Sequence, residues 1–224
     1  SLMSILRGRS KGDAAEGSTE EPDNSVHFLT FSDDRWVWSK PILTTRTQPQ
    51  PRAEHAAAKI RANEVLVFGG WADRPVKDLW LFDYANLTWE QVVASGVAPK
   101  PRYRHTCESV AGKFVVLGGS DNGDDVPDGC DYLGVHMLDL ETMQWSHPRL
   151  RGPNPFPRSG HASCVVGGHS IAIFGGRRTQ DVFFNDVCIL NVQTLTTTLV
   201  DVRDTPPVPI SNMSMDAVGS RLFV

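Results

Sequence analysis

Three histidines in equivalent sequence contexts are the first candidates for chemistry. His55, His105 and His161 each close a Pro-Arg-x-x-His motif, which reads PRAEH, PRYRH and PRSGH. Three imidazoles can bind zinc or iron when their nitrogens approach one ion at about 2.1 Å. The alternative is a structural role, in which each histidine hydrogen-bonds the backbone or an aspartate within its own repeat. We predict the structural role, because equivalent positions of successive repeats lie too far apart to share one ion.

The acidic stretch SDNGDDVPDGCD, residues 120–131, is the second candidate. Calcium prefers clustered carboxylate oxygens, but this spacing lacks the order of an EF-hand loop and its closing glutamate. The stretch also lengthens one repeat relative to the first, as an insertion between two strands does. We predict a solvated loop, for which contact with a partner is a further possible role.

Catalytic motifs are absent from the sequence, which has no GxSxG, no HExxH, no Walker loop and no GxGxxG that opens a helix. Its cysteines, Cys107, Cys130, Cys164 and Cys188, lie far apart and form no CxxC pair. Reduced buried thiols are therefore expected, which favours the cytoplasm. These observations predict a protein without enzyme activity, metal site or cofactor.

Charge and hydropathy narrow the class of partner. The formal net charge is −4, so no basic field attracts nucleic acid or anionic lipid. No apolar stretch approaches the roughly 20 residues of a transmembrane helix. The expected partner is another protein or a peptide, not nucleic acid or a membrane.

The chain repeats itself with a period of about 50 residues. The Pro-Arg motifs start at Pro51, Pro101 and Pro157. Each is followed by an apolar run that ends in paired glycines, VLVFGG, FVVLGG and IAIFGG, and then by LFD, MLD or ILN. Farther along stands a tryptophan, Trp89 or Trp145, which the third copy replaces with Thr197.

Each repeat contains four short apolar stretches between turn-forming residues, and in the first copy these are HAAAKI, VLVFGG, DLWLFDY and TWEQVV. Such stretches predict strands, and their short connections predict an antiparallel meander. A repeated four-stranded sheet of this size is a propeller blade. The glycine pairs are expected where the backbone turns into positive φ and a neighbouring blade approaches closely. They are Gly69, Gly70, Gly118, Gly119, Gly175 and Gly176.

The order PRxxH, then VFGG, VLGG or IFGG, then LFD or MLD, then Trp resembles the kelch repeat, over roughly residues 26–224. The resemblance implies an all-β propeller of four-stranded antiparallel blades, usually six or seven of them. The histidine resembles that of cytosolic kelch proteins such as the Rab9 effector with kelch motifs. We expect this chain to be part of a longer propeller; the alternative is that another chain or a second copy supplies the missing blades.

The repeat landmarks divide the chain. The polar residues 1–25 are expected to form a flexible N-terminal segment, and residues 26–224 the propeller. Its parts are a half blade at 26–48, blades at 49–98, 99–154 and 155–206, and the start of another blade at 207–224. A further domain is possible after Val224.

The resemblance also implies a binding face. In kelch propellers that capture peptides, the arginine of the Pro-Arg motif and the loop after the glycine pair lie on one face. For the motif arginines, the alternative is that they brace the loops through aspartates or carbonyls, and the two roles are not exclusive. The implied partner-binding residues are Arg52, Trp71, Arg74, Arg102, Ser120, Arg158, Arg177 and Arg178. The residues expected to be structural are the six glycines, the three histidines, and Trp38, Trp89 and Trp145. The indoles of Trp89 and Trp145 are expected to fill space between blades.

The leading hypothesis is a non-catalytic scaffold that binds a protein through its face loops. The alternative is a regulatory or substrate-recognition arm of a larger enzyme, for example a kelch-containing serine/threonine phosphatase or a ubiquitin-ligase adaptor. An enzyme in its own right, like galactose oxidase or the plant specifier proteins, is disfavoured because the sequence has no convincing set of metal ligands.

Overall fold

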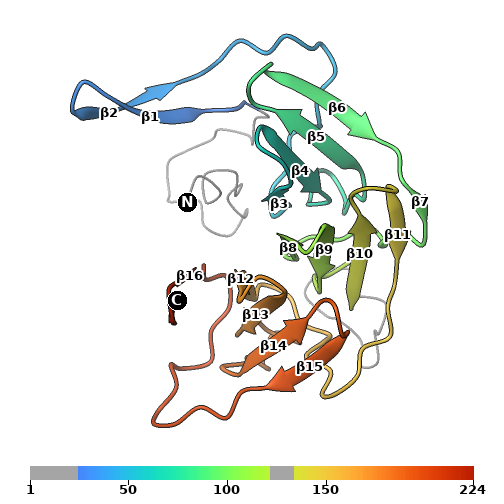
Figure 1. Ribbon diagram of the computed structural model, residues 1–224, viewed down its shortest axis with the longest axis vertical. Helices are drawn as coiled ribbons and strands as arrows, with labels where there is room; N and C mark the ends of the chain where they lie inside the picture. The colour runs from blue at the N-terminus through green and yellow to red at the C-terminus, as the bar shows by residue number, and fades with distance from the viewer. Residues whose placement is uncertain (1–24, 122–133) are drawn as a thin grey trace.

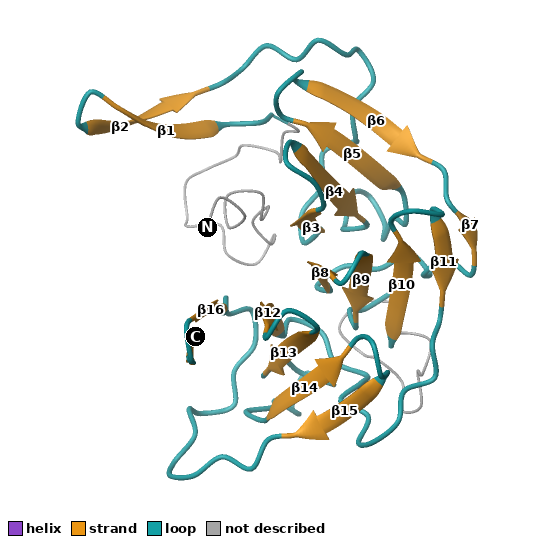
Figure 2. Ribbon diagram, viewed as in Figure 1, coloured by secondary structure: helices purple, strands orange, loops and turns teal. Residues whose placement is uncertain are grey.

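The computed structural model describes residues 25–121 and 134–224. The predicted flexible segment up to residue 24 and residues 122–131 of the acidic stretch lie outside the described residues. All regular elements of the described part are β-strands (Figure 2), and no helix that could cross a membrane occurs there. The predicted all-β class is confirmed.

The strands form sheets that are arranged in an arc about a common axis (Figure 1). The first blade consists of β3 (Ala56–Lys59), β4 (Glu64–Phe68), β5 (Leu79–Asp83) and β6 (Thr88–Val92). The second consists of β8 (Thr106–Val110), β9 (Lys113–Leu117), β10 (Val135–Asp139) and β11 (Gln144–Ser146), with β7 (Ser95–Gly96) added in parallel at its outer edge. The third consists of β12 (Ala162–Val166), β13 (Ser170–Phe174), β14 (Val187–Asn191) and β15 (Thr196–Leu199).

A two-stranded hairpin lies at each end of the arc. One is β1 (Phe28–Ser32) with β2 (Arg35–Ser39), and the other is β16 (Asp216–Val218) with β17 (Arg221–Phe223). The two hairpins form separate sheets among the described residues. Within the blades every neighbouring pair of the four main strands is antiparallel, as the short connections predict.

Asx turns join the third and fourth strands of each blade. The Asp83 carboxylate accepts hydrogen bonds from the backbone N–H groups of Ala85 and Asn86 at 2.9 and 3.0 Å. Asp139 and Asn191 accept equivalent bonds in the other two blades. These side chains satisfy the turn's backbone donors, which is why the LFD, MLD and ILN sequences end in Asp or Asn.

The core lies between the blades rather than inside one sheet. Alternate side chains of each strand point to opposite faces, so Leu66 and Phe68 of β4 pack toward Phe114 and Val116 of β9. Trp145 belongs to the same cluster, with its ring 5.7 Å from that of Phe68. The indole of Trp145 therefore fills the space between the first and second blades.

Trp89 and Trp38 have different environments although they align in the sequence. Trp89 is 6% exposed and packs on Phe82 with ring centroids 4.6 Å apart. Trp38 is 58% exposed, so the structural role expected for this residue is wrong. It lies on β2, which pairs with β1 alone among the described residues, and every residue of β2 is exposed. In the part of the chain that the structure describes, no second sheet covers the indole.

Each connection between blades runs along the outer edge of the next blade. The N–H groups of Thr44, Ser95 and Arg151 donate to the carbonyls of Leu87, Met143 and Leu195 at 3.0, 3.1 and 2.9 Å. In the third blade, the Thr197 hydroxyl also donates to the Pro153 carbonyl at 2.5 Å. Thr197 thus holds the connection by hydrogen bonding at the position where the other blades have a tryptophan.

The glycine pairs follow β4, β9 and β13, and all six have positive φ. The N–H of Gly70 donates to the carbonyl of Arg102, the motif arginine of the next blade, at 2.9 Å. A Cβ on Gly69 would lie 2.8 Å from the same carbonyl oxygen. The pair is therefore needed both for the turn and for the approach of the next blade.

The first prediction compares two glycines of similar φ. Gly69→Ala should lower the free energy of unfolding by about 3 kcal/mol, because it adds a clash with the Arg102 carbonyl to the strain of positive φ. Gly167→Ala should cost only about 1 kcal/mol, because Gly167 has φ 60° and a Cβ there would meet no other atoms within 4 Å. Urea denaturation measures both, and equal losses would contradict the proposed close approach.

The second prediction compares the aligned tryptophans. Trp89→Ala should destabilise the chain by about 3–5 kcal/mol, the cost of deleting a buried aromatic side chain. Trp38→Ala should change the stability by no more than about 0.5 kcal/mol, because its indole is exposed. A near-neutral Trp89→Ala in the same denaturation experiment would show that this indole does not support the blade.

Candidate functional site

Paired backbone hydrogen bonds hold together the two loops of each blade that were expected to share a face. Ala53 exchanges two N–H to carbonyl bonds with Trp71, each 2.8 Å long. Tyr103 and Ser120 do the same at 2.9 Å, as do Ser159 and Arg177. The Pro-Arg loop and the loop after the glycine pair therefore lie side by side in all three blades. We call this end of the blades the loop face.

The motif arginines are buried beneath the loop face. The Arg158 guanidinium binds both carboxylate oxygens of Asp186 at 2.8 Å and donates to the Gly175 carbonyl at 3.0 Å. Arg52 binds Asp78 at 2.5 and 2.8 Å and the Gly69 carbonyl at 3.1 Å. Each arginine thus joins the Pro-Arg loop to the glycine pair of its own blade.

The prediction of partner contact is wrong for four residues. Arg52, Arg102 and Arg158 are 6%, 0% and 3% exposed, and Ser120 is 2% exposed. A guanidinium whose donors serve carbonyls inside the blade cannot also reach a partner. The structure instead has the bracing arrangement that was the alternative for these arginines.

The ion pair between Arg52 and Asp78 has an electrostatic signature. Burial by itself would raise the pKa of the Asp78 carboxyl. The hydrogen bonds from Arg52 and from the Trp80 indole outweigh burial, and they hold this pKa below its usual value. The carboxylate is therefore charged in the folded protein at neutral pH.

The motif histidines connect blades. His105 Nε2 lies 3.0 Å from the Phe68 carbonyl oxygen, and His161 Nε2 lies 3.0 Å from Thr106 Oγ1. Both partners belong to the preceding blade, so the predicted bond within the same repeat is wrong for these two, although their setting is structural. Burial, followed by the charge of Arg102, keeps the pKa of His105 well below its usual value.

His55 is only partly buried, and its Cβ would lie 2.8 Å from a Cβ added to Gly70. Among residues 25–121 and 134–224, no group of three or more His, Cys, Asp or Glu side chains could hold a metal ion.

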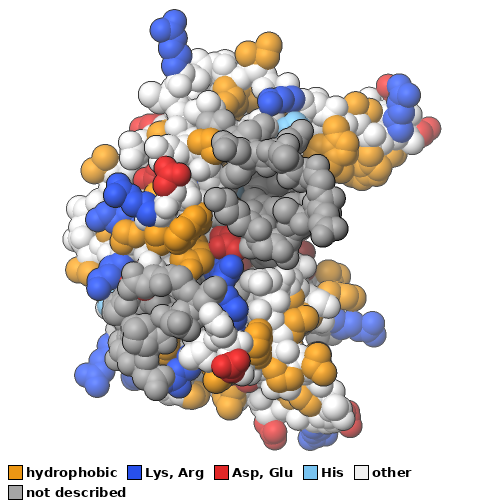
Figure 3. Space-filling view, turned by 180° about the vertical axis from the view of Figure 1, so that it is seen from behind, with side chains coloured by type: hydrophobic (Ala, Val, Ile, Leu, Met, Phe, Trp, Pro, Cys, Tyr) orange, Lys and Arg blue, Asp and Glu red, His pale blue; other side chains and the backbone are white. Residues whose placement is uncertain are grey.

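The accessible part of the loop face combines aromatic and charged side chains. Trp71 is partly exposed and lies edge-on to the buried ring of Tyr103, with ring centroids 5.1 Å apart. Arg104 lies over the Tyr103 ring at 5.4 Å and forms an ion pair with Glu54 at 2.9 Å. Arg74 is exposed, and Arg177 and Arg178 are partly exposed. In the space-filling view, basic, acidic and apolar side chains are interspersed over one side of the molecule (Figure 3).

Glu54, Tyr103 and Arg104 were not among the predicted site residues. They occupy the two variable positions of PRxxH, which read Ala-Glu, Tyr-Arg and Ser-Gly in the three copies. The variation between copies is a signal that could have identified them. Positions that bracing requires recur, whereas these positions differ from blade to blade.

A chain of backbone hydrogen bonds crosses the blades at the second of these positions. The N–H of Arg104 donates to Glu54, that of Gly160 to Arg104, and that of Asn212 to Gly160, at 3.1, 2.9 and 2.7 Å. All four residues have positive φ, between 55° and 62°. These bonds fix the spacing of the loops around the axis.

His136 is a buried titratable group outside the motif. It is 4% exposed and stacks on His147 with ring centroids 4.4 Å apart. Burial, assisted by the nearby Arg102 and His147, lowers the pKa of His136 from 6.5 to about 3. In the unfolded chain the same imidazole binds a proton at much higher pH.

The third prediction follows from this difference. Between pH 6.5 and about 3 the unfolded state binds more protons at His136 than the folded state does. Stability should therefore fall as the pH drops through this window, by up to about 1.4 kcal/mol per pH unit from this one group. His136→Phe keeps the ring and should give a shallower slope in urea denaturation across the window. His27→Phe, at an exposed histidine, is the matched control, and identical slopes for wild type and His136→Phe would contradict the assignment.

Comparisons with known proteins give a consistent result. Residues 11–224 match the family described as the KLHDC2/KLHL20/DRC7 Kelch-repeats domain. The chain is 29% identical over 203 residues to acyl-CoA-binding domain-containing protein 4 of Arabidopsis thaliana, with 89% of this chain and 29% of that protein covered. It is 29% identical over 197 residues to human kelch domain-containing protein 3, with 81% and 50% covered.

A solved structure supports the same fold. The structure of YjhT superposes with a TM-score of 0.68 at 19% sequence identity, and covers 88% of this chain and 65% of that one. This chain spans from about a third to half the length of the two relatives named above.

Proposed function

We propose that this chain, which belongs to the kelch-repeat family, is a non-catalytic scaffold that binds another protein through its loop face. The observation that carries the proposal is the contrast within each pair of joined loops. Recurring arginines and glycines are buried and hold the loops, whereas Trp71, Arg104 and Arg177, at positions that differ between blades, keep part of their side chains accessible. Trp71, Arg74, Arg104 and Arg177 are the contacts we assign to the partner.

The chemistry of these side chains favours a protein partner. Tryptophan, tyrosine and arginine are the residue types that contribute most to protein interfaces, because they bury large areas and hydrogen-bond in defined geometry. Here Trp71 and Tyr103 pack edge to face, and Arg104 is held over Tyr103 by its ion pair with Glu54. A surface that is already ordered loses little conformational entropy on binding.

The non-catalytic part of the proposal rests on how the reactive groups are used. The imidazoles of His105 and His161 form bonds between blades. Cys107, Cys164 and Cys188 are buried free thiols, and burial raises the pKa of Cys164 to about 11. A protonated buried thiol is a poor nucleophile. Free thiols also support our placement of the protein in the cytoplasm.

A second candidate is that the propeller is the recognition arm of a larger protein, such as an enzyme or a ubiquitin-ligase adaptor. The observation that favours it is the short span of this chain, which covers 29% of an Arabidopsis relative named for an acyl-CoA-binding domain. In that case the loop face selects the substrate and the chemistry is done elsewhere. An enzyme or adaptor domain joined to the propeller in the natural protein would favour this second candidate.

The fourth prediction tests the loop face. Proteins captured from a cell extract by the wild-type chain should be lost with Arg177→Glu and with Trp71→Ala, and purified partner should then bind these variants at least ten-fold more weakly. Arg61→Glu is the control, because Arg61 lies at the opposite end of β4 and its side chain is 57% exposed. The melting temperatures of Arg177→Glu and wild type should agree. Equal affinity of Arg177→Glu, Trp71→Ala and wild type would refute binding through this face.

A further inference from the structure

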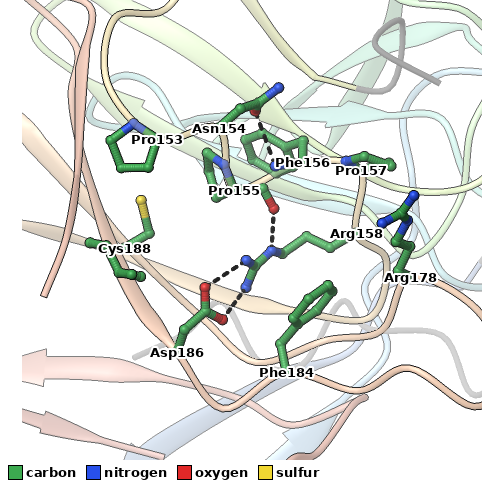
Figure 4. Close-up of a pocket in the computed structure, with 11 residues that line it drawn as sticks. Pro153, Asn154, Pro155, Phe156, Pro157, Arg158, Arg178, Phe184, Asp186 and Cys188 are labelled. Atoms are coloured by element: carbon green, nitrogen blue, oxygen red, sulfur yellow. Dashed lines mark hydrogen bonds and ion pairs between the residues drawn. The ribbon is translucent and has the colours of Figure 1, made fainter. Parts of the chain in front are cut away.

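The third blade contains a pocket of ≈ 270 Å³ beside its Pro-Arg loop (Figure 4). Pro153, Pro155 and Phe184 line its walls, Leu199 lines its outer side, and the Cys188 thiol is also part of the lining. Pockets for drug-sized ligands are about 300–1,000 Å³. This pocket is therefore of a size for a single side chain.

The first blade shows what occupies the equivalent position there. Trp80 and Cys188 are each the second residue of the third strand, and they pair across to Gln91 and Leu199 on the fourth strand. Each also follows by two residues the aspartate that binds the motif arginine, Asp78 or Asp186. Side chains at these two positions point to the same face of their sheets. The first blade thus carries an indole where the third carries a thiol.

The indole of Trp80 is hydrogen-bonded to that aspartate. Its Nε1–H donates to Asp78 Oδ2 at 2.6 Å, while the same carboxylate accepts two bonds from Arg52. Trp80 is 8% exposed and lies edge-on to Trp89, with centroids 6.5 Å apart. The first blade therefore contains the occupied form of this site.

The third blade has the same acceptor without the indole. Among the described residues, the Asp186 carboxylate accepts its hydrogen bonds from Arg158, at 2.8 Å to each oxygen. Its side chain is 31% exposed, compared with 24% for Asp78. Carboxylate oxygens accept more than one bond each, so Asp186 retains capacity for a third donor.

Two positions that hold a tryptophan in the first blade hold other residues in the third, and these residues compensate to different degrees. Thr197 replaces Trp89, and its hydroxyl holds the connection at Arg151 and Pro153 over the vacated space. Cys188 replaces Trp80, and nothing described takes the place of that indole. The aromatic wall at this point is Phe184, over which the Arg158 guanidinium lies at 4.4 Å.

We propose that this pocket binds a tryptophan side chain of a partner protein, in the place that Trp80 fills in the first blade. The indole packs against Phe184, Pro153 and Leu199, and its N–H donates to Asp186. The six tryptophans of the chain all lie in the described residues, so none of the remaining segments can supply the indole. The inference rests on the proposed function only in assigning the indole to a partner protein.

The test is a titration of the isotope-labelled chain with indole and with 1-methylindole, followed by nuclear magnetic resonance. Indole should give saturable shifts at the amides of Phe184, Cys188 and Leu199, and should bind about five-fold more tightly than 1-methylindole, which lacks the donor. Absence of saturable shifts with indole, or equal affinities of the two compounds, would overturn the proposal.

Variants locate the binding site. Cys188→Trp should fill the pocket from within and abolish indole binding, whereas Cys188→Ser leaves it open and should keep the wild-type affinity. If Cys188→Trp does not fold, Leu199→Glu provides a second test. Leu199 is 54% exposed, so this variant should fold, and it should weaken indole binding. Unchanged binding to Leu199→Glu and Cys188→Trp would place indole elsewhere. Since the loop-face variants Arg177→Glu and Trp71→Ala leave this pocket intact, failure of one proposal is separable from failure of the other.

Discussion

The close approach of each glycine pair to the Pro-Arg loop of the next blade is the contact on which the rest of the structure depends. The N–H groups of Gly70 and Gly119 donate to the carbonyls of Arg102 and Arg158, at 2.9 and 3.0 Å. The guanidinium of each arginine then returns to the carbonyl of its own blade's glycine pair, as Arg102 does to Gly118 at 2.8 Å. The motif arginine thus links its blade to the preceding blade through its backbone carbonyl, and it links to the glycine pair of its own blade through its side chain. A propeller needs both links, since neighbouring sheets share no strand-to-strand ladder.

This constraint separates the residues that build the loops from those that face solvent. The glycine pair recurs because the contact between blades requires a backbone without Cβ atoms, and the arginine recurs because its guanidinium ties the Pro-Arg loop to the glycine pair of its own blade. The two positions after Pro-Arg and the one after the glycine pair are held in place by the same bonds, but their side chains are not part of them. They can therefore change without loss of the fold, and this freedom allows Trp71, Arg104 and Arg177 to give each blade a different accessible surface.

The period, the strands and the turns could be predicted from the sequence because each depends on residues close together in the chain. The Asx turns after β5, β10 and β14 and the positive φ of the glycine pairs are of this kind. The burial of Arg102 could not be predicted, because recurrence of Pro-Arg is equally expected for a brace and for a binding ring. The partners of His105 and His161 were missed since they lie on the preceding blade, and a repeat pattern gives no register between blades. Trp38 aligns with Trp89, yet its exposure is decided by the absence of a covering sheet among the described residues.

Divergence between copies of a repeat can create a site without any new structural element. When Thr197 stands in place of an indole, a hydroxyl can still hold the connecting segment, so the loss of volume is offset by hydrogen bonds to Arg151 and Pro153. When Cys188 stands in place of an indole, the thiol is too small to fill the space and too weak a donor to satisfy Asp186. The blade nevertheless keeps its fold, because Asp186 is still held by Arg158 and the strand still pairs on both sides. The acceptor remains although the side chain that uses it in the first blade is replaced, and Phe184, which stands where the first blade has Val76, adds an aromatic wall beside it. Together they form a site suited to the group that the first blade supplies from its own strand.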